Sequence, residues 1–442
     1  MNPVLVVPGG RPLTGGVEVP GDKSLSHRAL LLAAVADGTS VIRGLSDGDD
    51  VRRTAAAVGA LGATVETTPV GGTRVTGGRR LIHAPGGPLD LGNSGTTMRL
   101  LAGLVAGFDV TVVLTGDASL SGRPMDRVAR PLRLMGASVE GGGERCLPPL
   151  TIRGGGLVGI DYSPPMASAQ VKSCVLLAGL EAEGETVVRE RVPTRRHTEE
   201  MLHLCGADVT EDDDDGTHVV RVRRSALESF VFDVPGDPSQ AAFWIVAGCV
   251  VPGSEVTLER VYAGAGRRGF LDVLVRMGAD IEEVPVTGPG DLATTATVRA
   301  RYGPLRATTV EGGEITGLDE VPVLAVAAAC AEGTTVFSGV GELRVKESDR
   351  MAAVVALVRA FGARAEADGD DLVVQGAPSL SPARFDAGGD HRMAMAAAVA
   401  GASVAGGAEP SLITGFESVT TSYPRFADHL ERLAGRGAGG GS

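Results

Sequence analysis

Residues 55–66 read AAAVGALGATVE, a helical pattern that ends in a glycine and continues as a short strand. The glycine fits the position just after a helix, where a left-handed backbone costs glycine little. The phrase returns along the chain at about seventy-residue intervals, which indicates an internal structural repeat. Its copies end at Gly62, Gly136, Gly206, Gly278 and Gly362, with a weaker sixth copy at Gly435.

A second phrase alternates with the first: an apolar helix, a turn and a β-branched strand. Its copies lie at 29–42, 98–113, 171–188, 241–258, 321–337 and 393–406. These helices are apolar nearly all round, so we expect them to be buried. Six units of two helices and several strands exceed one core, which predicts an α/β protein with two domains of three units each.

The chain crosses between the predicted domains at two similar stretches, VEVPGDK (17–23) and FDVPGDPS (232–239). Both contain Val-Pro-Gly-Asp, and we expect a hinge there. The predicted division is a domain with both chain termini, an inserted domain and a disordered tail, with boundaries 1–20 plus 236–435, 21–235 and 436–442, respectively.

Composition excludes several classes of protein. The 442 residues are 43% hydrophobic and carry a net charge of −13, which argues against a nucleic-acid surface. The five cysteines form no CxxC pair and are typical of a reduced, cytoplasmic protein. The N-terminus lacks a signal peptide pattern, and the longest apolar stretch, 241–253, is too short to span a membrane. We expect a cytoplasmic monomer without nucleic-acid or membrane partners.

Lysine is scarce in this chain. Of the 41 basic residues three are lysines, Lys23, Lys172 and Lys346, which leaves 41 − 3 = 38 arginines. Lysine differs from arginine in being a compact charge that can lose its proton when desolvated. We therefore interpret Lys23 as retained for a point contact or a proton transfer.

Polar residues cluster at the start of each apolar helix. Helix N-termini expose backbone N–H groups and carry partial positive charge, so they attract anions. Ordinary capping accounts for Asp237 and Ser239. Capping does not account for basic residues near these N-termini, because a cation there opposes the helix dipole. A bound anion would remove the conflict at Lys23, Arg28, Arg99 and Arg392.

Further charged residues fall in predicted loops. Arg123 follows a Ser-Gly pair, and RVKESDR (344–350) contains Lys346, Glu347 and Arg350, a spacing that also suits a solvated helix face with ion pairs. Arginines suit phosphate and carboxylate groups, and Asp319 and Glu347 are candidate acids or bases. The sequence has no Walker motif, GxGxxG after a strand, or His/Cys metal constellation, so we expect neither cofactor nor metal.

Eight stretches together resemble the 5-enolpyruvylshikimate-3-phosphate synthase family (3-phosphoshikimate 1-carboxyvinyltransferase), the glyphosate target of the shikimate pathway. They are GDKSLSHRALLLAA (21–34), LGNSGTTMRLLAG (91–103), LTGDASLSGRPMDR (114–127), ASAQVKS (167–173), VPGDPSQAAF (234–243), LDEVPVLA (318–325), RVKESDR (344–350) and DHRMAMA (390–396). The resemblance implies two domains, each of three βαβαββ units with buried helices, in an inverse α/β barrel-like fold that closes over the substrates.

The resemblance also implies the reaction: the enolpyruvyl group of phosphoenolpyruvate passes to the 5-hydroxyl of shikimate 3-phosphate through a tetrahedral intermediate that loses phosphate. It implies catalytic roles for Lys23, Asp319 and Glu347. Contacts implied for shikimate 3-phosphate are Lys23, Ser24, Arg28, Ser168, Ala169, Gln170, Thr194, Asp319 and Lys346. Contacts implied for phosphoenolpyruvate are Lys23, Gly95, Arg123, Gln170, Arg350 and Arg392.

Two positions depart from the best-known form of the family pattern. Thr421 stands where some members have a lysine, which puts one phosphoenolpyruvate contact in doubt, and Thr194 replaces a loop serine but keeps the hydroxyl. One alternative is UDP-N-acetylglucosamine enolpyruvyltransferase, which shares the fold and the donor substrate. Its loop usually carries a cysteine where this chain has Ala118, and its Lys-Asn-Ala motif is Lys-Ser-Leu here. The other alternative is a non-catalytic repeat protein that binds a phosphate ligand.

Overall fold

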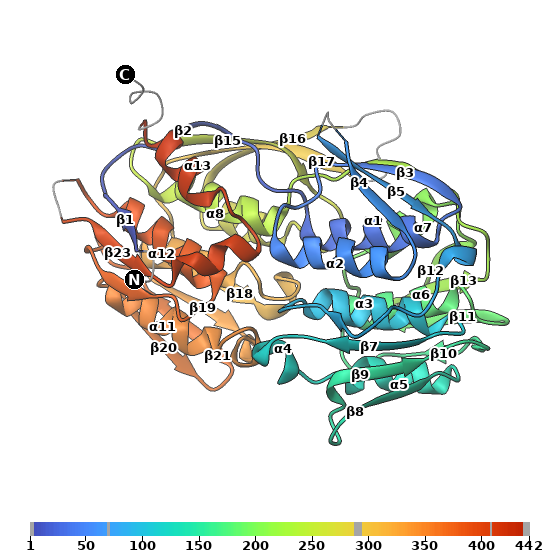
Figure 1. The fold of residues 1–442 in the computed structure, drawn as a ribbon. Helices are drawn as coiled ribbons and strands as arrows, with labels where there is room; N and C mark the ends of the chain where they lie inside the picture. Colours follow the sequence, from blue (N-terminus) through green and yellow to red (C-terminus); the bar gives the residue numbers. More distant parts are fainter. Residues whose placement is uncertain (1–3, 69–70, 287–293, 407–408, 436–442) are drawn as a thin grey trace. The chain divides into compact units, whose positions relative to one another are not determined.

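The computed structural model describes residues 4–68, 71–286, 294–406 and 409–435, so the tail predicted at 436–442 lies outside the described residues. Contacts within the chain divide it into two compact units, Met1–Pro20 with Pro235–Ser442, here called the terminal unit, and Gly21–Val234, the inserted unit. Both units combine helices with mixed sheets, so the predicted α/β class is confirmed (Figure 1). Within the described ranges, no helix is long and apolar enough to cross a membrane.

The described part of the inserted unit has three four-stranded sheets with one topology, β14-β3-β5-β4, β6-β7-β9-β8 and β10-β11-β13-β12. In each, the first two strands of the order are parallel, and the remaining pairs are antiparallel. The strands are β3 (Gly38–Arg43), β4 (Thr64–Thr67), β5 (Gly72–Gly77), β6 (Leu89–Asp90), β7 (Thr111–Thr115), β8 (Ser138–Gly142), β9 (Leu147–Arg153), β10 (Asp161–Tyr162), β11 (Glu185–Glu190), β12 (Val209–Asp214), β13 (Thr217–Arg223) and β14 (Val231–Asp233).

Two kinds of helix alternate in the inserted unit. The apolar helices α1 (Lys23–Val35), α3 (Gly95–Ala106) and α6 (Ala169–Gly179) are buried, with α3 packed against both of the others. Every residue from Leu25 to Val35 in α1 is buried, which confirms the prediction made from its all-round apolar pattern. The others are α2 (Asp49–Ala60), α5 (Asp126–Leu134), α7 (His197–Leu204) and the short α4 (Ala118–Ser121) and η1 (Arg79–Leu81).

The terminal unit repeats this plan twice in full, in the sheets β16-β17-β15-β2 and β18-β19-β21-β20. Helices α8 (Pro238–Val250), α10 (Val321–Ala329) and α12 (His391–Ser403) are buried and pack against one another. Its strands are β2 (Thr14–Val17), β15 (Glu255–Tyr262), β16 (Asp280–Val286), β17 (Thr295–Arg301), β18 (Thr309–Glu311), β19 (Thr334–Ser338), β20 (Arg364–Asp368) and β21 (Asp371–Gln375). Its other helices are α9 (Gly269–Arg276), α11 (Arg350–Ala360), α13 (Phe426–Leu433), η2 (Gly312–Glu314), η3 (Gly341–Val345) and η4 (Phe416–Thr421).

The sixth repeat differs from the predicted βαβαββ unit. Its sheet has three strands in the described residues, β1 (Leu5–Val7), β23 (Ser411–Thr414) and β22 (Arg384–Asp386). Strand β1 comes from the N-terminal segment and pairs antiparallel with β23. In the other sheets, the last strand of the repeat itself takes this place. Among the described residues no strand follows α13, where the repeat pattern in the sequence is also weakest.

The two Val-Pro-Gly-Asp stretches occupy equivalent places in their repeats. Strand β2 precedes the first stretch but pairs with β15, whereas β14 precedes the second and pairs with β3. The inserted unit therefore interrupts one repeat between its first strand and its first helix. Asp22 and Asp237 end the two stretches, and each caps the helix that follows by accepting a backbone N–H bond. A cap of this kind contributes about 1 kcal/mol to helix stability.

Candidate active-site residues

Lys23 is the first residue of α1 and lies in the inserted unit. Its Nζ is 3.0 Å from Oδ2 of Asp50, which is in the first turn of α2. The side chains of Lys23 and Asp50 are 21% and 14% exposed. An ion pair that is still open to solvent can exchange its partner for a ligand, so the ammonium of Lys23 is accessible to an anion.

Arg28 lies one turn further along α1 and donates hydrogen bonds to three neutral oxygens. Its Nε donates to Thr198 Oγ1 (2.7 Å), Nη2 to Ser173 Oγ (2.6 Å) and Nη1 to the carbonyl of Ser24 (2.9 Å). The residue is 3% exposed. These bonds fix the plane of the guanidinium without cancelling its charge, and a guanidinium has five N–H donors in all. This arrangement suits a planar bidentate contact with a phosphate or carboxylate.

The first turn of α6 presents three predicted substrate contacts in sequence. Ser168 is the N-cap, Ala169 is the first helical residue, and Gln170 follows. The Gln170 amide accepts from Nη1 of Arg99 (2.7 Å) and donates to Thr96 Oγ1 (2.9 Å), both on α3. The side chain of Gln170 thereby links the starts of α3 and α6, the two helix ends predicted to bind different substrates.

Gly95 and Arg123 lie close together at the start of α3. A Cβ atom added to Gly95 would lie 3.0 Å from Arg99 Nη1 and 3.3 Å from Arg123 Nη1. Arg123 donates to the carbonyl of Asn93 (3.4 Å), to the Asn93 side chain and to Ser119 Oγ (3.2 Å). Two guanidinium groups therefore flank a glycine at the positive end of a helix, which is suitable for binding an anion.

Thr194 lies in the segment between β11 and α7 and is 5% exposed. Its hydroxyl donates to Glu190 Oε1 (2.5 Å), and its backbone N–H points to Oε2 of the same residue (3.4 Å). A hydroxyl has a single proton and two lone pairs. Because that proton is engaged in the hydrogen bond to Glu190, the hydroxyl oxygen of Thr194 can accept a hydrogen bond from a ligand.

In the terminal unit, Asp319 lies between two predicted phosphoenolpyruvate ligands. Its Oδ1 is 3.4 Å from Arg350 Nη1 and 3.6 Å from Arg392 Nε, and its backbone carbonyl accepts from Arg392 Nη1 (3.2 Å). The Asp319 side chain is 23% exposed, whereas that of Arg350 is fully buried. A partly exposed carboxylate beside two guanidinium groups can accept a proton from a bound hydroxyl.

Asp390 is the principal anchor of Arg350. Nε and Nη2 of Arg350 donate to Asp390 Oδ2 (2.8 Å) and Oδ1 (3.2 Å). Burial opposes the charge of Arg350, but the carboxylates of Glu347, Asp390 and Asp319 raise its pKa above the usual value. Burial likewise opposes ionisation of Asp390, yet the Arg350 charge and hydrogen bonds hold the pKa of Asp390 below its usual value. The pair is therefore ionised at neutral pH.

The stretch before α11 carries Lys346 and Glu347. Glu347 Oε2 is 2.7 Å from Arg350 Nη2, and its side chain is 33% exposed, while Lys346 Nζ is 3.5 Å from Glu342. The alternative interpretation, a solvated helix face, is wrong, because both residues precede the helix and Arg350 is buried. Thr421, at the end of η4, donates its hydroxyl to the Ser418 carbonyl (2.8 Å).

The family follows from comparison with known proteins. A family model described as EPSP synthase (3-phosphoshikimate 1-carboxyvinyltransferase) matches residues 7–430. The chain belongs to this family. Relatives named 3-phosphoshikimate 1-carboxyvinyltransferase from Gloeobacter violaceus and Streptococcus uberis are 48% and 43% identical, and each match covers 96% of this chain and 97% of the relative. The resemblance inferred from the eight motifs is confirmed.

Solved structures confirm the predicted fold. A structure of EPSP synthase from Acinetobacter baumannii is 38% identical, with a TM-score of 0.85 over 99% of this chain and 98% of that chain. An enolpyruvyl transferase from Streptomyces tendae shares the fold at 19% identity, with a TM-score of 0.76 over 98% of this chain and 97% of that chain.

Some partners of the predicted residues were not identified from the sequence. Ser173 and Asn93 lie inside motifs quoted for the family, so these motifs could have indicated them as site residues. Asp50 and Thr198 lie outside those motifs, 27 and 170 residues from their partners Lys23 and Arg28. No spacing rule connects residues so far apart. Lys23 and Asp50 meet because the two helices of one repeat pack together, and Arg28 and Thr198 meet because α1 packs against α7 of another repeat.

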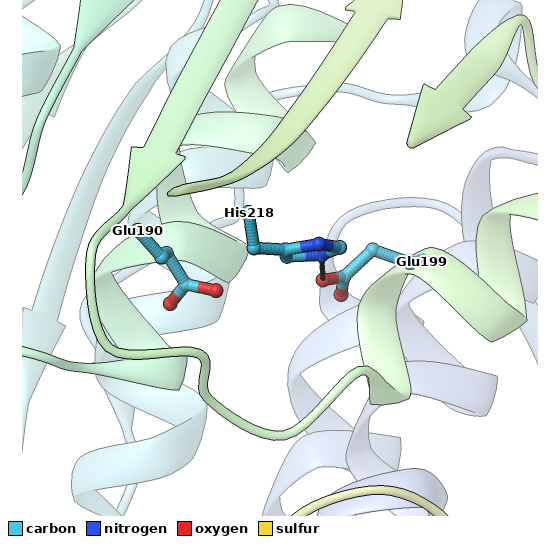
Figure 2. Close-up of side chains that lie close together, drawn as sticks. All are labelled: Glu190, Glu199 and His218. Carbon is cyan, nitrogen blue, oxygen red and sulfur yellow. Dashed lines mark ion pairs between the residues drawn. The ribbon is translucent and has the colours of Figure 1, made fainter. Parts of the chain in front are cut away.

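One group of side chains in the described part of the chain has the composition of a metal site. Ligand atoms of Glu190, Glu199 and His218 all lie within 4.8 Å of one another (Figure 2). However, Nζ of Lys172 lies 2.7 Å from Glu190 Oε2 and 2.6 Å from Glu199 Oε1. The carboxylates therefore already have a cation supplied by the chain, and the residues do not fit a resident metal ion.

Proposed function

We propose that the protein transfers the enolpyruvyl group of phosphoenolpyruvate to the 5-hydroxyl of shikimate 3-phosphate, giving 5-enolpyruvylshikimate 3-phosphate and phosphate. The reaction is a step of the shikimate pathway toward chorismate and the aromatic amino acids. The observation that carries the proposal is the near-full-length family match, supported by relatives with that activity in their names. The basic side chains gathered at helix starts are consistent with two anionic substrates.

Shikimate 3-phosphate takes its contacts mainly from the inserted unit in this proposal. Lys23 and Arg28 provide charge for its anionic groups, and the hydrogen bonds that orient Arg28 support this role. The proposed contacts are Lys23, Ser24, Arg28, Ser168, Ala169, Gln170 and Thr194 from the inserted unit, with Asp319 and Lys346 from the terminal unit.

Phosphoenolpyruvate takes its contacts from both units. Gly95 allows close approach of the ligand to the start of α3, where Arg123 lies, and Gln170 and Lys23 contact both substrates. Arg350 and Arg392 supply charge from the terminal unit. Thr421 adds no charge here, because a threonine hydroxyl is neutral, and this hydroxyl donates to the Ser418 carbonyl within η4.

The chemistry needs one proton donor and one proton acceptor. Glu347 donates to C3 of phosphoenolpyruvate, Asp319 accepts the proton of the 5-hydroxyl, and the oxygen adds at C2. The tetrahedral intermediate then expels phosphate while C3 returns a proton to Glu347, which restores the carbon–carbon double bond, and the proton held by Asp319 leaves with the phosphate. Lys23 compensates charge that develops on both substrates. The proposal requires no cofactor, because acid–base groups and charge suffice for addition and elimination.

We further propose that the two contact-defined units are the predicted domains, 1–20 plus 236–435 and 21–235, and that the protein is a cytoplasmic monomer without nucleic-acid or membrane partners. The contact division and the repeat plan support the domain assignment. The net charge of −13 supports the absence of a nucleic-acid partner. Size-exclusion chromatography with light scattering measures the mass directly.

Phosphate release tests the function. The purified protein is given phosphoenolpyruvate with either shikimate 3-phosphate or UDP-N-acetylglucosamine. We expect release that depends on shikimate 3-phosphate. Release with the nucleotide sugar alone would favour the sister enzyme, and binding of shikimate 3-phosphate without turnover would favour a non-catalytic protein.

A further inference from the structure

The buried charge cluster around Lys172 has no role in the proposed chemistry. Lys172 is on α6 and its side chain is fully buried, with Nζ 2.7 Å from Glu190 and 2.6 Å from Glu199. Those two carboxylates are 2% and 0% exposed. Burying three charges is costly unless they are paired. Such a cluster is therefore compatible with a stable fold only if the ammonium and the carboxylates lie within ion-pair distance of one another.

The two carboxylates lie at the two ends of one connecting segment. Glu190 is the last residue of β11, and Glu199 is in the first turn of α7, which begins at His197. A single ammonium thus joins the end of the strand to the start of the helix and bridges the segment 191–196 between them. Within that segment Thr194 bonds to Glu190, through its hydroxyl (2.5 Å) and its backbone N–H (3.4 Å).

The same cluster adjoins the partners of Arg28. Ser173 follows Lys172 on α6, and Thr198 precedes Glu199 on α7. Their hydroxyls are 2.6 Å apart, and both accept hydrogen bonds from Arg28. A displacement of α7 relative to α6 would therefore misalign the guanidinium that the proposed function assigns to shikimate 3-phosphate.

His218 completes the cluster from β13. Its Nε2 is 3.3 Å from Glu211 and 3.8 Å from Glu199, and its Nδ1 is 3.6 Å from Asp213. Figure 2 shows the imidazole beside the Glu199 carboxylate, with Glu190 on the other side. Burial opposes ionisation of Glu199, but the nearby imidazole of His218 and the charge of Lys172 hold its pKa below the usual value. The cluster therefore holds Glu199 as a carboxylate next to the ammonium.

We propose that Lys172 is a positioning residue for shikimate 3-phosphate: its ammonium joins β11 to α7 and so sets the place of Arg28 and of segment 191–196. This inference rests on the proposed function. It also explains why lysine is kept at 172 in an arginine-rich chain. A compact ammonium fits between two buried carboxylates, where the larger planar guanidinium would displace one of the elements.

Steady-state kinetics of Lys172→Met test the proposal, because methionine keeps much of the side-chain length without charge. We expect KM for shikimate 3-phosphate to rise by about 10- to 100-fold, the order of loss that a misplaced contact produces. KM for phosphoenolpyruvate should rise by a smaller factor than KM for shikimate 3-phosphate. Gly95 and Arg123 lie on other elements, and the side chain of Gln170, which is shared by both substrates, is held by Arg99 and Thr96 of α3. A general loss of structure would not separate the two constants.

Cys174→Ala is the matched control, since Cys174 is also buried on α6, two residues further along. It should leave both KM values unchanged. If Lys172→Met does not fold, the triple variant Lys172→Met/Glu190→Gln/Glu199→Gln removes the three charges together, which is far less costly than leaving carboxylates without their cation. The triple variant should still show the raised KM for shikimate 3-phosphate.

A folded Lys172 variant whose KM for shikimate 3-phosphate stays within twofold of wild type would overturn the inference while leaving the proposed function intact. A wild-type protein that neither binds nor converts shikimate 3-phosphate would overturn both. Stoichiometric Zn²⁺ binding by the wild type that is lost in Glu190→Gln would also contradict the inference, because the ammonium would then not be the resident cation.

Discussion

The candidate ligand-binding arginines Arg28 and Arg123 of the inserted unit and Arg350 of the terminal unit have different described hydrogen-bond partners. In the inserted unit, the hydrogen bonds described for Arg28 and Arg123 go to hydroxyl, carbonyl and amide oxygens, all of them neutral. In the terminal unit, Arg350 pairs with three carboxylates, those of Asp319, Glu347 and Asp390. Neutral acceptors orient a guanidinium without bringing a negative charge to it. Carboxylates stabilise its burial, and a ligand must then compete with them.

The difference indicates how each unit contributes to binding. In the proposed function, the inserted unit supplies guanidinium groups that hydrogen bonds to neutral oxygens have oriented. The terminal unit keeps Asp319 and Glu347, the candidate acid–base groups, beside the cations that stabilise their charge. Substitutions in each unit test this difference.

The largest expected effect is on turnover. Lys23→Arg keeps the charge but replaces a compact, titratable ammonium with a guanidinium. We expect kcat to fall by about 10²- to 10⁴-fold, the usual contribution of a positioned acid–base or charge-stabilising group. Phosphate release measures it, with Arg43→Lys in the exposed pair with Asp233 as the control. Near-normal turnover in Lys23→Arg would contradict the role inferred from lysine scarcity.

The next effect is on stability of the terminal unit. Asp390→Asn leaves the buried Arg350 without its principal carboxylate, and we expect a loss of about 3–5 kcal/mol in the free energy of unfolding. Asp233→Asn, in a pair whose side chains are 40% and 57% exposed, should cost less than about 1 kcal/mol. Urea denaturation measures both. Equal losses would contradict the claim that burial distinguishes these pairs.

The same pair predicts a pH effect of known sign. The folded-state pKa of Asp390 lies below its usual value, so the pair stabilises the fold at neutral pH, and this contribution is lost as the pH falls through that folded-state pKa. The Asp390→Asn variant should lack this part of the acid destabilisation.

A third effect concerns His27, which lies buried in α1 with Nδ1 2.7 Å from Thr54 Oγ1. Burial lowers its pKa from 6.5 to about 3. Below pH 6.5 the unfolded chain binds a proton that the folded protein does not, so stability falls by up to about 1.4 kcal/mol per pH unit between 6.5 and 3. His27→Gln should reduce that slope in urea titrations from pH 7 to 4, and His83→Gln, at an exposed position, should not. An unchanged slope in His27→Gln would show that His27 is protonated in the fold.

The smallest effect is at Gly95. A Cβ there would lie 3.0 and 3.3 Å from the tips of Arg99 and Arg123, which can shift at modest cost because they are flexible. We expect Gly95→Ala to raise KM for phosphoenolpyruvate by about fivefold, equivalent to about 1 kcal/mol, with KM for shikimate 3-phosphate nearly unchanged. Initial rates at varied substrate concentrations measure both constants. A larger rise for shikimate 3-phosphate would contradict the assignment of Gly95.

Much of the fold could be predicted from the sequence, because each repeat shows the same local pattern of apolar residues and glycine. The apolar pattern of residues 29–35 predicts burial of α1, and glycine at 62, 136 and 206 predicts where helices end. The incomplete sixth sheet could not be predicted. Its antiparallel partner for β23 is β1, about four hundred residues away, and pairing over such a distance depends on how whole repeats stack.

The candidate site was predicted in part. Motif positions gave Lys23, Arg28 and Asp319 as functional candidates, and they carried the resemblance to the family. They did not indicate that Asp390 secures Arg350 while neutral hydroxyls secure Arg28. That distinction depends on which side chains of separate helices meet, and no local pattern encodes it.

The repeat, the buried helices and the residue types available for chemistry follow from local periodicity and composition, so they can be predicted from the sequence. The contacts of each charge follow from the packing of distant segments. Lys23 and Lys172 are the same residue type near the starts of similar helices, yet one faces a partly exposed aspartate and the other is enclosed by two buried glutamates. The strength and availability of a charge depend on its burial and its neighbours, and both are properties of the packed fold.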